Sequence, residues 1–129
     1  MKTLPKPTNA ELAILRVLWR HGDATVRDIL RHFNEDNGAE AGYTTILKNL
    51  QIMTEKGLVV RDETKRPQVY AAGSTEEQTQ QLFIDDLLAK AFDGSAKRLV
   101  MRALAGRRVA EKELRKVERM LDALEKEDA

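Results

Sequence analysis

The sequence predicts a mostly α-helical chain with one small β-hairpin. Apolar residues recur at helical spacing over residues 12–33 and 46–53, and two short apolar segments flank a polar turn over residues 58–72. Helical spacing then returns over residues 74–124. With 129 residues, 42% of them hydrophobic, the chain can bury one core and carry an appendage. We therefore expect two domains, residues 1–73 and 74–129.

The first two helices are predicted from their start signals. Thr8 and Glu11 in TNAE can form a capping box, and Gly22 can end the helix that follows. The apolar stripe of this helix contains Leu12, Leu15 and Trp19. A second helix begins after Thr25, with Asp28 at its third position, and we expect a polar loop over residues 34–42. Its stripe contains Val26, Ile29, Leu30 and Phe33.

A third helix and a hairpin complete the first domain. The helix begins near Tyr43 and ends at Gly57, which suits a left-handed C-terminal cap. Strands over residues 58–60 and 69–72 enclose the exposed turn DETKRPQ. Three helices and a hairpin within about 75 residues can form a winged helix-turn-helix.

The third helix has an apolar side and a polar side. Ile46, Leu50 and Met53 fall on one face, while small or polar side chains fall on the other: Thr44, Thr45, Lys48 and Gln51. In a helix-turn-helix protein this helix enters the major groove and reads base edges. The alternative is an ordinary solvated helix face.

Basic residues of the hairpin are candidates for contact with the DNA backbone. Lys65 and Arg66 lie in the turn and Arg61 precedes it, although the neighbouring acidic residues offset their charge. Arg66 is the better candidate, because its forked donors match a phosphate. Tyr43 can hydrogen-bond a phosphate or cover the edge of the core.

Three helices are predicted after residue 74. The first begins at the capping box STEE, residues 74–77, and ends at Gly94. The second lies between Ser95, its expected N-cap, and Gly106. The third spans residues 110–126. Their apolar faces are broader than so small a unit can cover, so we expect a homodimer. The expected dimer interface contains Leu82, Phe83, Leu87, Leu88, Phe92, Leu99, Val100, Leu104, Leu114, Val117, Leu121 and Leu124.

Four segments together resemble the penicillinase-repressor family, the BlaI/MecI/CopY type of winged-helix transcriptional repressor. They are AELAILRVLWRHGDATVRDI, YTTILKNLQIMTEKGLV, YAAGSTEE and FDGSAKRLVMRAL. The resemblance implies a dimer that binds a palindromic operator with TACA/TGTA half-sites and controls β-lactam resistance or related stress genes. It implies base readout by residues matching Thr44, Thr45, Leu47 and Lys48, and backbone contact by Lys65 and Arg66. Tyr43, Gln51 and Arg61 join the expected backbone set.

The resemblance also implies a partner, a membrane-bound metalloprotease sensor system that inactivates the repressor. In the β-lactam-responsive members cleavage falls at an Asn-Phe bond, where this sequence has Arg102-Ala103. Copper-responsive members carry a C-terminal cysteine cluster, and this sequence contains no cysteine. The inducing signal therefore cannot be transferred from either group.

Other functions are less well supported by the sequence. The charges nearly cancel, with 22 Lys and Arg against 21 Asp and Glu, so a nucleic-acid partner must be bound by local charge. We find no catalytic motif, no carboxylate matched to His21 or His32, and no reason to expect a metal or cofactor. The expected location is the cytoplasm. The alternative function is a protein-binding winged-helix adaptor, whose third helix would contact another subunit instead of DNA.

Overall fold

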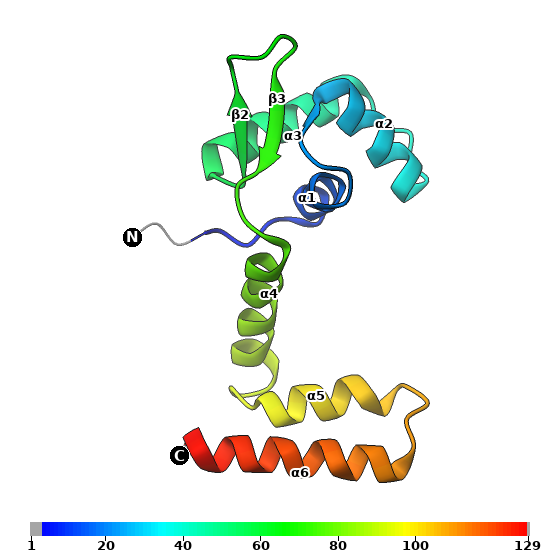
Figure 1. The fold of residues 1–129 in the computed structure, drawn as a ribbon, viewed down its shortest axis with the longest axis vertical. Coiled ribbons are helices and arrows are strands. Elements are labelled where there is room, and N and C mark those ends of the chain that lie inside the picture. Colours follow the sequence, from blue (N-terminus) through cyan, green and yellow to red (C-terminus); the bar gives the residue numbers. More distant parts are fainter. Residues whose placement is uncertain (1–3, 129) are drawn as a thin grey trace. The chain divides into compact units, whose positions relative to one another are not determined.

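The computed structural model describes residues 4–128 and contains two compact units, Met1–Gln80 and Gln81–Ala129 (Figure 1). The first unit contains α1 (Asn9–His21), β1 (Ala24–Thr25), α2 (Val26–Asn37), α3 (Tyr43–Lys56), β2 (Val59–Asp62) and β3 (Val69–Ala72). α4 (Glu76–Ala91) spans the division, and α5 (Ala96–Ala105) and α6 (Glu111–Asp128) belong to the second unit. The prediction of a mostly helical chain with a small β-hairpin is confirmed.

The predicted caps of the first helices are present. Thr8 accepts a hydrogen bond from the amide of Glu11 at 3.2 Å, and the Glu11 carboxylate accepts one from the amide of Thr8 at 2.9 Å. Thr25 caps α2 through the amide of Asp28. Because these side chains satisfy amides that the helices leave free, they fix where α1 and α2 begin.

α2 is longer than expected, since it continues to Asn37 into the predicted loop. Gly38 ends it in the left-handed conformation at φ 57°. Asn34 then holds the next residues, because its side chain both donates to and accepts from the backbone of Ala41, at 3.1 and 2.9 Å. The polar segment is thus an ordered helix end and tight turn.

The sheet has three strands in the order β1-β3-β2, whereas the sequence predicts a two-stranded hairpin. β2 and β3 form the expected antiparallel pair, with Val59 opposite Ala72 and Asp62 opposite Val69. The additional strand β1 places Ala24 opposite Tyr70. Two residues carry no periodic pattern of their own, so β1 depends on its pairing with β3.

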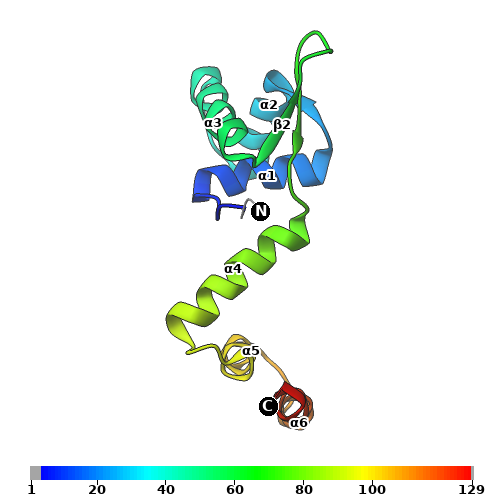
Figure 2. The same ribbon diagram turned by 90° about the vertical axis from the view of Figure 1, so that its left-hand side faces the viewer.

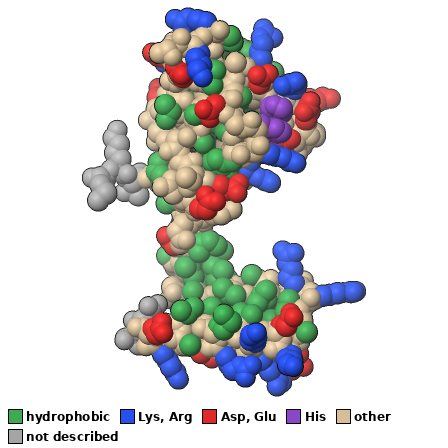
Figure 3. All heavy atoms as spheres, viewed as in Figure 1, with side chains coloured by type: hydrophobic (Ala, Val, Ile, Leu, Met, Phe, Trp, Pro, Cys, Tyr) green, Lys and Arg blue, Asp and Glu red, His purple; other side chains and the backbone are tan. Residues whose placement is uncertain are grey.

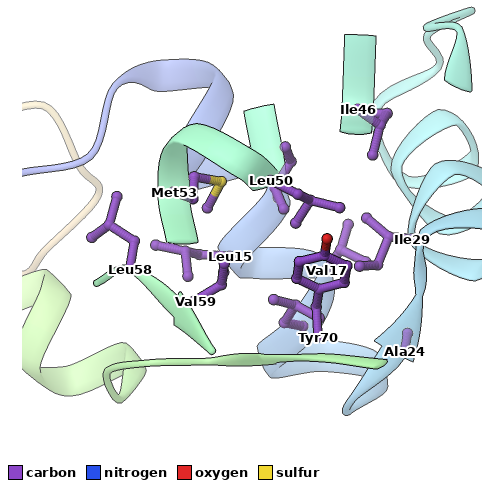
Figure 4. Packing of buried hydrophobic residues seen from close by; sticks show 12 residues of the cluster. Leu15, Val17, Ala24, Ile29, Ile46, Leu50, Met53, Leu58, Val59 and Tyr70 are labelled. Carbon is purple, nitrogen blue, oxygen red and sulfur yellow. The ribbon is translucent and has the colours of Figure 1, made fainter. Parts of the chain in front are cut away.

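The core of the first unit lies between its helices and the sheet (Figure 4). Ile46, Leu50 and Met53 of α3 have at most 1% of their surface exposed, which confirms the predicted apolar face. They pack with residues of α1, α2 and the sheet, including Ile14, Leu15, Val17, Ile29, Leu58, Val59 and Tyr70. α3 is therefore fixed in orientation, and its opposite side is left outward.

The first unit includes the start of α4. Thr79 in α4 is only 1% exposed, and its hydroxyl lies 3.1 Å from the hydroxyl of Ser74. Trp19 donates its indole N–H to the carbonyl of Ser74 at 3.0 Å. The predicted capping box beginning at Ser74 is wrong by one residue, because Thr75 and Gln78 exchange the two cap hydrogen bonds instead.

In the second unit α5 and α6 run side by side (Figure 2). Ser95 caps α5 through the amide of Arg98, as predicted. Lys97 bonds to Asp122 of α6 at 2.7 Å, and this hydrogen bond raises the pKa of Lys97. Within residues 81–127 no hydrophobic side chain is fully buried, so this unit has no closed core of its own.

Candidate nucleic-acid interface

The outward side of α3 carries the predicted base-reading residues. Thr44, Thr45 and Lys48 are exposed, and so is Gln51 one turn further along. Leu47 is only half-buried. Because residues three and four apart share a helix face, Thr44, Lys48 and Gln51 form one continuous polar strip. The structure therefore brings the predicted set together on one exposed surface.

The first turn of α3 is uncapped. Its N-cap residue is Gly42, which offers no side-chain acceptor, whereas Thr8, Thr25 and Ser95 cap α1, α2 and α5. The free amides and the positive end of the helix dipole favour an anion there. A phosphate or an acceptor on a base edge could satisfy these groups in place of a side chain.

The turn between β2 and β3, which we call the wing, is held by short-range hydrogen bonds. The Asp62 carboxylate accepts from the hydroxyl of Thr64 at 2.6 Å and from its amide at 3.0 Å, and these bonds lower the pKa of Asp62. Arg66 donates to the carbonyl of Glu63 at 2.8 Å. Basic side chains gather at this end of the first unit (Figure 3). The wing thus presents Lys65 and Arg66 from a defined turn.

Arg61 differs from the other basic residues of the wing. It forms an ion pair with Glu63, and hydrogen bonds to Glu63 and Tyr70 raise the pKa of Arg61. Much of its charge is therefore already balanced within the wing. Any contact of Arg61 with DNA must compete with Glu63, while Lys65 forms no ion pair with any described residue.

A small hollow of about 310 Å³ lies between the wing, the start of α2 and the start of α3. Its lining is mostly apolar and includes Leu47, Pro67 and Tyr70. At its edge the Arg27 guanidinium lies 5.6 Å from the centre of the Tyr43 ring, within the range of a cation–π contact. Arg27 has no signal in the sequence, since nothing in the sequence alone indicates that α2 brings it to Tyr43.

The two histidines lie together at the packing of α1 and α2. Their rings stack with centroids 3.7 Å apart, and His21 lies 3.0 Å from Asp36. The sequence indicates no carboxylate–histidine pair, but α2 extends far enough to bring Asp36 to His21 and Glu35 near His32. Within residues 4–128 no three His, Asp or Glu side chains are arranged to hold a metal ion.

These features define a winged helix-turn-helix protein with an exposed, uncapped third helix. No helix in the described part of the chain is long and apolar enough to cross a membrane. Residues 7–123 match the model of the family described as penicillinase repressor. The chain therefore belongs to the penicillinase repressor family and is a DNA-binding transcriptional repressor, a class that is not enzymatic.

Comparison with solved structures supports the fold. The chain is similar to the monomeric form of BlaI from Bacillus licheniformis, solved in complex with the blaP half-operator, with a TM-score of 0.50 and 23% identity. The similarity covers 60% of this chain and 93% of that chain. Among curated proteins no match was found.

Proposed function

We propose that this chain is a homodimeric, sequence-specific repressor that binds an inverted repeat of TACA/TGTA-type half-sites in the cytoplasm. Each α3 enters a major groove, where Thr44, Thr45, Leu47 and Lys48 read base edges. Backbone contacts come from Tyr43, Gln51, Arg61, Lys65 and Arg66. The regulated genes, on this proposal, serve β-lactam resistance or a related stress response.

The observation that carries this proposal is the exposed polar strip of α3. Lys48 can donate to the acceptors of guanine, and the threonines offer hydroxyls and methyl groups to base edges. Protein interfaces, in contrast, are enriched in aromatic residues and depleted of lysine. The strip therefore favours DNA over the alternative of a protein-binding adaptor. The BlaI structure supports the same choice, since a protein of this fold is there bound to DNA.

Dimerisation is supported by the second unit. Its apolar residues remain accessible: Ile84 is 39% exposed, Leu87 45% and Leu124 57%. One face of this unit is dominated by hydrophobic side chains (Figure 3). A second copy would cover them, because a symmetric dimer presents the same face twice. The chain carries a net charge of only +1, so its overall charge adds little to DNA binding. Two DNA-binding units joined in a dimer bind DNA more tightly than one unit alone.

Inactivation by a membrane-bound metalloprotease system is part of the proposal, at a bond other than the family's Asn-Phe. Arg102 and Ala103, which stand at the corresponding place, are exposed on α5. A protease needs this segment extended, so cleavage would require local opening of α5. Incubation of the repressor with a membrane metallopeptidase of this kind should give two fragments and abolish DNA binding.

The test of DNA reading uses two substitutions with opposite expectations. Lys48→Ala should relax base preference, whereas Arg66→Ala should weaken binding to all sequences about equally and reduce the salt slope by roughly one unit. Lys90→Ala, an exposed change in α4, is the matched control. If Lys48→Ala keeps the full base preference of the wild type, the proposal that α3 reads the bases is wrong.

A further inference from the structure

We propose that Arg27 binds a DNA phosphate, and that Tyr43 acts as a positioning residue whose aromatic ring holds the Arg27 guanidinium in place. This inference rests on the proposed function and changes one of its assignments. The proposed function gives a backbone contact to Tyr43, whose hydroxyl would make it. The geometry points to Arg27 as the group that touches the phosphate, with the Tyr43 hydroxyl dispensable.

The position of Arg27 supports a phosphate contact. It is the second residue of α2, and α2 begins beside the first turn of α3 across the hollow shared with the wing. Arg27 and Tyr43 are both exposed at this hollow, and Tyr43 retains 44% of its surface. When the recognition helix α3 lies in a major groove, the preceding helix of the helix-turn-helix crosses the DNA backbone. That helix is α2, and Arg27 lies in its first turn.

The charge of Arg27 is not balanced within the protein. The neighbouring Asp28 pairs with Arg31 at 3.3 Å, and in the described residues no carboxylate forms an ion pair with Arg27. Arg61 in the wing, by contrast, is paired with Glu63. A guanidinium without a carboxylate partner can bind a phosphate without first breaking an internal ion pair.

The Tyr43 ring gives Arg27 a preferred orientation. An arginine side chain loses much rotamer freedom when it is fixed on a ligand, and a group already held against a ring loses less. A cation–π contact depends on the positive charge of the group and does not need all five of its N–H donors, so donors remain for a phosphate. The contact therefore positions Arg27 without occupying the donors that a phosphate needs.

The contribution of the ring can be separated from that of the hydroxyl by conservative variants. Tyr43→Phe keeps the ring, so binding should stay within about twofold of wild type. Tyr43→Leu keeps apolar volume at the hollow but removes the ring, and should weaken binding about two- to fivefold. In an Arg27→Ala background Tyr43→Leu should have no further effect, because the group it positions is absent.

The experiment measures binding of the full chain to a labelled inverted-repeat duplex and to a mixed-sequence duplex at several salt concentrations. Arg27→Ala should weaken binding to both about tenfold and lower the salt slope by about 0.9, while Arg27→Lys keeps the slope and recovers part of the affinity. A wild-type salt slope in Arg27→Ala, or equal weakening by Tyr43→Phe and Tyr43→Leu, overturns the inference.

Failure of the inference is distinguishable from failure of the proposed function. Wild-type protein that binds neither duplex overturns both. Wild-type protein that prefers the inverted repeat, with Lys48→Ala relaxing that preference and Arg27→Ala changing nothing, upholds the repressor and overturns the role of Arg27. Thermal unfolding of Arg27→Ala and Tyr43→Leu should match wild type within about 0.5 kcal/mol of unfolding free energy, because both side chains are exposed.

Discussion

Lys56→Met is expected to destabilise the first unit, because it leaves a buried carboxylate without its cation. Glu11 is 2% exposed, and the Lys56 ammonium donates to both of its oxygens, at 3.1 and 2.9 Å. This pair joins the first turn of α1 to the last turn of α3. Methionine retains the length and apolar stem of lysine but cannot balance the charge.

The magnitude follows from how far water reaches the pair. Removing one partner of a fully buried ion pair costs roughly 3–5 kcal/mol of unfolding free energy. The side chain of Lys56 is 37% exposed, so water can partly solvate the abandoned carboxylate, and we expect about 2 kcal/mol. For a unit of this size that loss lowers the midpoint of thermal unfolding by about 10 °C.

Urea unfolding followed by tryptophan fluorescence measures this loss, since Trp19 is the single tryptophan and lies in the first unit. The matched control is Lys48→Met on the exposed side of the same helix, which should change stability by less than about 0.5 kcal/mol. Equal stability of Lys56→Met and wild type would refute the reasoning.

The same pair predicts a pH dependence. Burial raises the pKa of Glu11, but the hydrogen bonds from Thr8 and Lys56 outweigh it and hold this pKa below the ordinary value of 4.5. A lowered folded-state pKa means that the contribution is complete above pH 4.5 and is lost as the pH falls through the folded-state value. The stability difference between wild type and Lys56→Met should therefore shrink in acid. A constant difference down to pH ~3 contradicts this account.

Three other predictions test packing and assembly. Gly73→Ala should cost about 2 kcal/mol in urea unfolding, because a Cβ there would lie 2.5 Å from the carbonyl oxygen of Gly57, while Gly106→Ala meets nothing within 4 Å and serves as control. Thr79→Val should cost about 1 kcal/mol by leaving the buried Ser74 hydroxyl unpaired, and an unchanged midpoint would contradict that. Leu124→Lys should shift sedimentation toward the monomer without changing Trp19 fluorescence; an unaltered dimer would exclude Leu124 from the interface.

Local signals predicted the elements that depend on neighbouring residues. The capping box at Thr8, the cap at Thr25 and the left-handed Gly57 all rest on hydrogen bonds or backbone angles within a few residues. The apolar face of α3 follows from helical spacing alone, so its outward residues could be assigned as well. The exposed set that includes Lys48 was therefore predictable, although its contacts with DNA stay a prediction.

Features that depend on distant residues were missed. β1 forms only by pairing with β3, where Ala24 lies opposite Tyr70. Ser74 does not cap α4 as expected, and it forms hydrogen bonds with Trp19 and Thr79 instead. The proposed role of Arg27 depends on its contact with the Tyr43 ring, which the sequence does not show. Each of these contacts joins segments that no local pattern relates, so periodicity and capping rules could not reveal them.

The central claim is that two copies of the chain hold two α3 helices at a fixed separation on an inverted repeat. The most direct measurement compares binding to that repeat with binding to a duplex in which about five base pairs, half a helical turn, separate the half-sites further. We predict that the insertion weakens wild-type binding to the level of a single half-site, because the second helix then faces the wrong side of the duplex. Equal affinity for the two duplexes would contradict the claim.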